Sequence, residues 1–138
     1  MNWYLKVFKQ YFDFSGRARR KEFWMFTLFH FLFIFSTTFL VFFLTSDIYE
    51  DTETNYVYVA IICTYLLISI IPSIALTVRR LHDTGKSGWL YLIVIIPYLG
   101  WFTIMIFACM EGNRGSNKWG PNPKGIGNDS IIDQIGTE

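Results

Sequence analysis

Three long apolar runs dominate the pattern of hydrophobic and polar positions along the chain. They cover residues 23–44, 56–78 and 89–110, and none of them contains Asp, Glu, Lys or Arg. About 18 or more apolar residues in succession, at a rise of about 1.5 Å per residue, are enough to cross the hydrocarbon core of a bilayer as an α-helix. The pattern therefore predicts an all-α, polytopic membrane protein with three transmembrane helices.

The segment before the first run has a different helical pattern. Apolar and aromatic side chains recur there at spacings of three and four residues, at Trp3, Tyr4, Val7, Phe8, Tyr11 and Phe12. Lys6, Lys9 and Gln10 fall mostly on the opposite face. A basic amphipathic helix rich in Trp and Tyr is typical of the headgroup layer, so we expect an N-terminal interfacial helix. The same periodicity also fits a helix that packs on protein.

The distribution of Lys and Arg predicts how the chain is oriented. The arm at residues 1–22 holds six of them and the loop at residues 79–88 holds three, whereas the loop at residues 45–55 holds none and carries four carboxylates. Because Lys and Arg concentrate in cytoplasmic segments, we expect the N-terminus in the cytoplasm. Three complete crossings place the C-terminus outside. A third run that turns back at Pro97 and Gly100 brings the tail to the cytoplasmic side instead.

The composition agrees with a membrane location. Of the 138 residues, 52% are hydrophobic and 17% are charged, whereas about 25% are charged in an ordinary soluble domain. A secretory signal peptide does not explain the first run, because its apolar stretch has about 7–15 residues and ends at a small-residue cleavage site. The net charge is +1 and the basic residues adjoin the membrane, which argues against nucleic acid as a partner.

We expect residues 1–127 to form a single membrane domain, followed by a flexible C-terminal tail at residues 128–138. Within the domain, residues 111–127 are rich in Gly, Asn and Pro, which is typical of a turn-rich extramembrane cap. Cys63 and Cys109 are offset by about 10 Å in depth, which disfavours a disulfide, and their spacing matches no metal site. We therefore expect neither a metal ion nor another cofactor.

Five arginines lie within a few residues of the predicted cytoplasmic surface, namely Arg17, Arg19, Arg20, Arg79 and Arg80. Guanidinium groups match phosphate oxygens bidentately, so these side chains are candidates for binding an anionic lipid headgroup. Glu22 and Asp83 would orient the arginines that a ligand leaves free, and His82 would cap the end of the second helix. The simpler interpretation is that the arginines only set the orientation of the chain.

The neighbours His82 and Asp83 also suggest an acid–base pair, as in an enzyme that acts on a lipid phosphate. Adjacent residues seldom place their side chains in contact, and no Ser or Cys has an evident role as nucleophile. We therefore expect no catalytic residues. A nucleotide site is equally poorly supported, because Gly85, Lys86 and Ser87 resemble only the end of a phosphate-binding P-loop.

A set of residues inside the runs is predicted to form a polar plane about 10 Å below the cytoplasmic boundary. Its members are His30, Ser69, Pro72 and Pro97. Each proline deprives the carbonyl four residues earlier of its helical donor, which leaves Ile68 and Ile93 in need of a partner. His30 is a candidate donor, and an ionisable residue within a membrane is also a candidate functional site.

Three separated motifs give the chain a family resemblance. They are GRARRKEFW at residues 16–24, RRLHD at residues 79–83 with Gly88 and Trp89 following, and GSNKWGPNP at residues 115–123. In this order around the apolar runs, the motifs resemble the YhaH-like bacterial inner-membrane proteins, domain-of-unknown-function family 805. The resemblance implies a small multi-pass inner-membrane protein without an established reaction, substrate or cofactor.

These patterns together predict a non-enzymatic membrane protein. Its expected partners are the lipid bilayer, an anionic phospholipid bound through the cytoplasmic arginines, or a membrane-protein partner bound through the same surface. The alternative is a small transporter or channel component that uses the polar plane around His30. That role would need a homo-oligomer, because three helices are too few to build a pathway.

Overall fold

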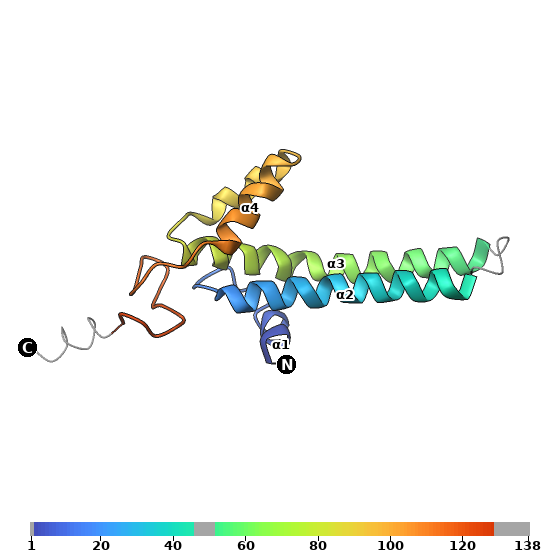
Figure 1. The fold of residues 1–138 in the computed structure, drawn as a ribbon, viewed down its shortest axis with the longest axis horizontal. Coiled ribbons are helices and arrows are strands. Elements are labelled where there is room, and N and C mark those ends of the chain that lie inside the picture. The colour runs from blue at the N-terminus through green and yellow to red at the C-terminus, as the bar shows by residue number, and fades with distance from the viewer. Residues whose placement is uncertain (1, 46–51, 129–138) are drawn as a thin grey trace, which may run out of the picture.

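The computed structural model describes residues 2–45 and 52–128 (Figure 1). The elements in chain order are α1 (Asn2–Lys9), α2 (Arg20–Thr45), α3 (Thr52–Asp83), the 3-10 helix η1 (Gly88–Ile95) and α4 (Leu99–Cys109). Within these described ranges the only β-type pairing is an isolated bridge between Asn117 and Gly120. The predicted all-α fold is confirmed.

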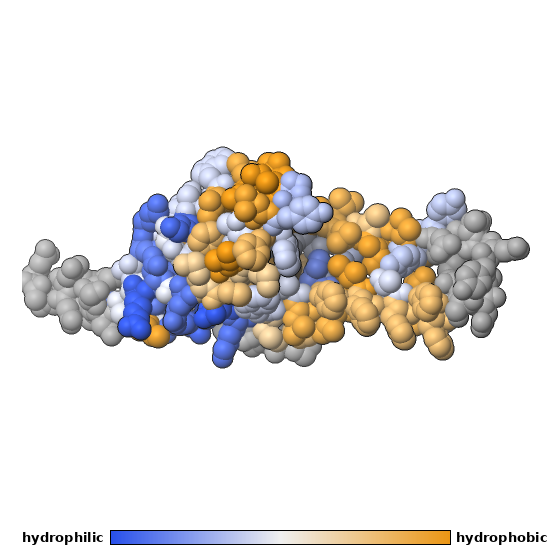
Figure 2. Space-filling model, turned by 45° about the horizontal axis from the view of Figure 1, so that its top comes forward, coloured by the Kyte–Doolittle hydropathy of each residue, from blue (hydrophilic) through white to orange (hydrophobic). Residues whose placement is uncertain are grey.

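The helices α2 and α3 lie side by side as a long antiparallel hairpin (Figure 1). Both are long and apolar enough to cross a membrane, over Arg20–Phe43 and Tyr56–Asp83. Only 6% of the apolar window in α2 and 22% of that in α3 are buried, which is unlike the core helices of a soluble protein. Figure 2 shows apolar residues along the hairpin and hydrophilic residues gathered at the end where α2 begins and α3 ends. This distribution suits a hairpin surrounded by lipid.

The third apolar run does not form one continuous helix. Its first part is η1, the chain reverses around Tyr98, which has a φ of 62°, and α4 runs back beside η1 (Figure 1). At Gly100 a Cβ atom would lie 2.1 Å from the carbonyl oxygen of Ile93, so only glycine permits this close return. With 11 residues, α4 is too short to cross about 30 Å of hydrocarbon. The prediction of a spanning helix over residues 89–110 is therefore wrong, and the chain turns back instead.

This reversal changes the position of residues 110–128, which we call the tail. α4 returns the chain to the end of the hairpin where α3 ends, and there the Asn113 amide donates to the Asp83 carbonyl at 2.8 Å. The tail through residue 128 thus lies at the same end of the hairpin as the arm. The prediction that three crossings separate the tail from the arm is wrong for these residues. Of the predicted flexible segment at residues 128–138, residues 129–138 lie outside the described residues, as do residues 46–51 of the acidic loop.

The helix α1 packs on α2 and α3 near this same end (Figure 1). Its Val7 is fully buried and belongs to a small core with Ala18, Phe26 and Leu76. Tyr4 stacks on Phe26, with ring centroids 5.6 Å apart. The apolar face of α1 therefore contacts protein, which is the alternative that its periodicity left open. Its location in the headgroup layer remains a prediction.

Candidate functional site

Asp83 is the last residue of α3, and both of its carboxylate oxygens are paired. Arg17 Nε lies 2.9 Å from Oδ1, and Arg80 Nη1 donates to Oδ2. All three side chains, which we call the arginine–aspartate cluster, are buried. A buried charge is tolerated only when it is paired and hydrogen-bonded, so two arginines around one aspartate require further acceptors.

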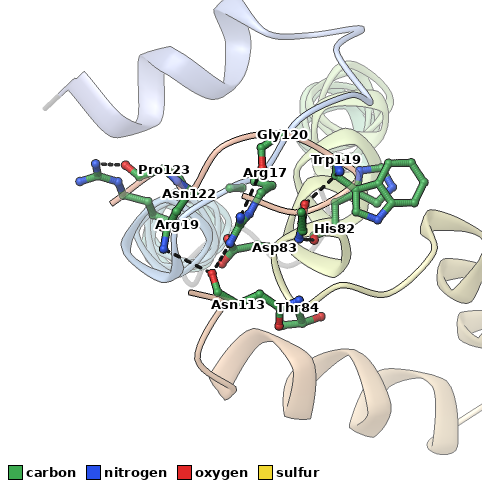
Figure 3. A network of polar contacts seen from close by, with 12 residues as sticks. Arg17, Arg19, His82, Asp83, Thr84, Asn113, Trp119, Gly120, Asn122 and Pro123 are labelled. Atoms are coloured by element: carbon green, nitrogen blue, oxygen red, sulfur yellow. Dashed lines mark hydrogen bonds and ion pairs between the residues drawn. The ribbon is translucent and has the colours of Figure 1, made fainter. Parts of the chain in front are cut away.

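The tail supplies these acceptors to Arg17. Its Nη2 and Nη1 atoms donate to the backbone carbonyls of Asn113 at 2.5 Å and Gly115 at 2.7 Å (Figure 3). The tail passes very close to Asp83 at Gly112. A Cβ atom at this glycine would lie 2.0 Å from the Oδ2 atom of Asp83. Arg17 therefore links the arm, the end of α3 and the tail through one guanidinium group.

Arg80 makes a second set of links between the same segments. It donates to the carbonyls of Ala18, just before α2, and Met110, just after α4. The Ala18 amide in turn donates to the Arg79 carbonyl at 3.1 Å. The three motifs found in the sequence thus meet at one place, and the cluster at their centre holds the polar end of the molecule together.

His82 lies beside this cluster and faces the tail. Its ring stacks on Trp119 with centroids 3.6 Å apart and an interplanar angle of 6° (Figure 3). Its Nδ1 atom lies 3.2 Å from the Gly16 carbonyl oxygen, and Asn117 Nδ2 donates to the His82 carbonyl at 3.0 Å. Sequence reasoning considered His82 and Asp83 as an acid–base pair, but the side chain of His82 contacts Gly16 and Trp119, whereas that of Asp83 is paired with arginines.

A second group of charges fixes α1 to the hairpin. Lys6 Nζ lies 3.1 Å from Oε2 of Glu22, whose side chain is buried. Gln10 Oε1 accepts a hydrogen bond from Arg79, which is also buried. The Oε1 atom of Glu22 and the Nη2 atom of Arg79 are buried without a hydrogen-bond partner among the described residues.

The structure gathers the five predicted arginines at one end of the hairpin, but in different surroundings. Arg17, Arg79 and Arg80 are buried and bound to protein groups. Arg19 donates to the Pro123 carbonyl and is half-buried, as is Arg20. Sequence reasoning missed the tail carbonyls as arginine partners. The density of Gly and Asn at residues 112–128 was a signal that such a loop exposes its backbone, but not of where it packs.

The residues of the predicted polar plane have separate partners. His30 Nδ1 lies 2.8 Å from the Tyr65 hydroxyl, and the two rings stack with centroids 5.1 Å apart. The Ile68 carbonyl, which Pro72 deprives of a helical donor, accepts a hydrogen bond from the Tyr11 hydroxyl at 2.7 Å. The donor to Ile68 is thus Tyr11, from the segment after α1, and not His30.

The other two members of the plane also lie in different settings. Ser69 is buried and donates to the Leu66 carbonyl at 3.1 Å. Pro97 is exposed in the η1–α4 turn, where the Ile93 carbonyl accepts from the Ile96 amide at 3.0 Å. The prolines therefore create carbonyls that local and tertiary donors satisfy.

An exposed ion pair lies outside the cluster in the described part of the tail. Lys124 Nζ lies 2.9 Å from Glu111 Oε1 and lowers the pKa of the Glu111 carboxyl. Because the pair is exposed, water and salt screen it, and it fixes the tail much less firmly than the buried cluster does.

Comparisons with known proteins agree with the motifs. A family model described as "Protein of unknown function (DUF805)" matches residues 11–121. The inner membrane protein YhaI of Escherichia coli K12 is 42% identical over 124 residues, which cover 90% of this chain and 97% of YhaI. The inner membrane protein YhaH of the same strain is 41% identical and is covered to 98%. No solved structure matches. The chain is therefore a membrane protein that belongs to the DUF805 family.

Proposed function

We propose that the protein is a non-enzymatic component of the bacterial inner membrane whose polar end binds anionic lipid headgroups on the cytoplasmic side. In this arrangement α2 and α3 cross the bilayer, the third run turns back within it, and the arm and tail both face the cytoplasm. The inner-membrane location of the E. coli relatives and the two long apolar helices support this placement.

The distribution of positive charge carries the proposal. All twelve Lys and Arg residues lie within residues 6–21, 79–86 and 114–124, the segments that meet at the hydrophilic end of the hairpin (Figure 2). The exposed ones among them are Lys9, Lys21, Lys86, Arg114, Lys118 and Lys124. Each Lys or Arg near an anionic leaflet contributes about 1 kcal/mol of attraction, so several of them together bind anionic lipid headgroups.

The twelve basic residues divide into two roles on this view. Arg17, Arg79 and Arg80 are buried, so we assign them to bracing the fold. The half-buried Arg19 and Arg20 and the exposed basic side chains other than Lys124, which is paired with Glu111, contact headgroups instead. The proposed headgroup site therefore consists of the more exposed basic residues at the polar end, and not of all five arginines predicted from the sequence.

Lipid retention tests the proposal. Native mass spectrometry of the detergent-purified protein would compare phosphatidylglycerol with phosphatidylcholine of the same acyl chains. We expect a preference for phosphatidylglycerol that falls severalfold in the triple variant Lys21→Gln, Lys86→Gln, Arg114→Gln. The matched control is Lys124→Gln, which removes a charge already paired with Glu111 at 2.9 Å and should change the preference least.

The result that would contradict headgroup binding is equal retention of the two lipids by the unmodified protein. Undiminished preference in the folded triple variant would contradict the assignment to the exposed side chains. Unchanged thermal unfolding of the triple variant would show that it remains folded.

A further inference from the structure

An aromatic cleft is lined by His82 but by no residue of the arginine–aspartate cluster. It has a volume of about 390 Å³, within the range of small-molecule sites. η1, the end of α3, the tail and the arm each contribute to its walls, through Phe14, His82, Trp89, Tyr91, Leu92 and Trp119. None of the contacts that hold the polar end together requires this space.

His82 presents an unused hydrogen-bond acceptor to this cleft. Its side chain is buried, at 4% exposure, and Nδ1 lies 3.2 Å from the Gly16 carbonyl oxygen, which can only accept. In the neutral ring the proton is therefore assigned to Nδ1, and Nε2 carries a lone pair. Nε2 has no hydrogen-bond partner among the described residues. A Cβ atom at Gly88, which lines the cleft, would lie 3.1 Å from it.

The walls of the cleft are apolar but uncovered. Trp89 is 81% exposed and Leu92 is 54% exposed, although both belong to η1, which packs on α3. The Trp119 ring also lines the cleft and stacks on the His82 ring. A flat, apolar ligand would cover these surfaces, since aromatic groups pack favourably in offset or edge-to-face contact.

The charge beside the cleft limits the kind of donor that fits. Lys118 Nζ lies 5.0 Å from the centroid of the Trp119 ring, and this ring also stacks on His82. A cationic headgroup at His82 would meet this ammonium group at close range, which disfavours it. The acceptor at Nε2 therefore suits a neutral donor such as a hydroxyl group.

We propose that this cleft binds an amphipathic phenol of the membrane. The hydroxyl group would donate to His82 Nε2, the ring would lie among Trp89, Trp119 and Tyr91, and the apolar chain would pass Leu92 into the lipid. A membrane quinol has this chemistry, and its oxidised quinone form does not, because the quinone offers carbonyl acceptors in place of hydroxyl donors. The site is independent of the headgroup surface.

Two redox forms of one compound test the hydrogen bond directly. Binding of decylubiquinol and decylubiquinone to the detergent-purified protein would be measured by microscale thermophoresis, with the quinol kept reduced under anaerobic conditions. We expect the quinol to bind about tenfold more tightly than the quinone, the effect of one hydrogen bond worth about 1.4 kcal/mol. Equal binding of the two forms, or no binding of either, would overturn the proposal.

Two further ligands distinguish the contribution of the aromatic ring to binding from that of the hydroxyl group. Dodecanol has the hydroxyl donor without the ring, and comparable binding of dodecanol would overturn the assignment to a phenol. 4-Decylphenol has both groups, so we expect it to bind. Affinity equal to that of decylubiquinol would indicate a general phenol site, whereas weaker binding would favour the quinol ring.

Matched variants locate the site. Trp89→Ala removes an exposed wall and should weaken quinol binding about tenfold without altering thermal unfolding. Trp101→Ala, at a tryptophan of α4 that is 69% exposed and does not line the cleft, should change nothing. His82→Phe keeps a ring against Trp119 and should abolish the preference for quinol over quinone. If His82→Phe does not fold, the Trp89 and Trp101 pair still decides, and unchanged quinol affinity in Trp89→Ala would refute the location.

Discussion

Asp83 is held at both carboxylate oxygens by arginines that approach from different segments, and all three side chains are buried. Removing the carboxylate charge leaves two buried guanidinium groups without their shared anionic partner. A broken buried pair commonly costs about 3–5 kcal/mol, because the remaining charge loses its partner without regaining water. At the scale of single residues, Asp83 is therefore the position on which the polar end depends most.

We expect Asp83→Asn to lower the free energy of unfolding in detergent by about 3–5 kcal/mol. Asparagine keeps the size of the side chain, so the loss reflects charge and not volume. Glu111→Gln is the control, since it neutralises an exposed carboxylate whose pairing with Lys124 is screened. Equal unfolding temperatures for the two variants would contradict the role given to the cluster.

Tyr11 acts at the same scale but within the apolar part of the molecule. Its hydroxyl donates at 2.7 Å to the Ile68 carbonyl, which Pro72 leaves without a helical donor. We expect Tyr11→Phe to destabilise the protein by about 1–3 kcal/mol, because the Ile68 carbonyl would then face an apolar environment without a donor. Tyr98→Phe, at a tyrosine that is 91% exposed, should have little effect.

A rescue distinguishes this hydrogen bond from simple packing. Pro72→Ala restores a backbone amide four residues after Ile68, so Tyr11→Phe should cost less in that background than in the unmodified protein. The free energies of unfolding of both single variants and the double variant give the coupling. If the losses in the free energy of unfolding were strictly additive, the Tyr11 hydroxyl would not be the donor to the Ile68 carbonyl.

At the scale of elements, the apolar composition of a segment does not predict whether the segment forms one continuous helix. The run at residues 89–110 is as apolar as the runs in α2 and α3, and its length alone predicts a third crossing. Pro97 cannot donate a helical hydrogen bond and Gly100 permits backbone contact, so the chain reverses and places the same apolar residues in two short, adjacent helices. Apolar length indicates that a segment avoids water, whereas the breakers within it decide whether the segment continues.

The candidate site was predictable only in part for a related reason. The clustering of Lys and Arg next to apolar runs showed which segments share a surface, and Glu22 and Asp83 were identified as the nearby anions. The other acceptors of Arg17, besides Asp83, are backbone carbonyls of the tail, which any residue type would offer. Side-chain chemistry therefore gave no indication of them, and their position followed from the reversal of the third run.

At the scale of the whole molecule, we propose that the arm, the end of α3 and the tail form one cytoplasmic surface. A buried charge cluster joins these three segments. The headgroup proposal and the phenol cleft both depend on this arrangement, because each uses tail residues beside groups from the hairpin.

Cysteine accessibility tests that claim most directly. In a background with Cys63→Ser and Cys109→Ser, single cysteines at Ser15, Asp51 and Ser116 would be treated with a membrane-impermeant maleimide in intact spheroplasts. The account predicts labelling at position 51 alone, and labelling at positions 15 and 116 only after the membrane is opened. Labelling at position 116 from outside, with position 15 still protected, would place the tail across the membrane from the arm and would contradict the account.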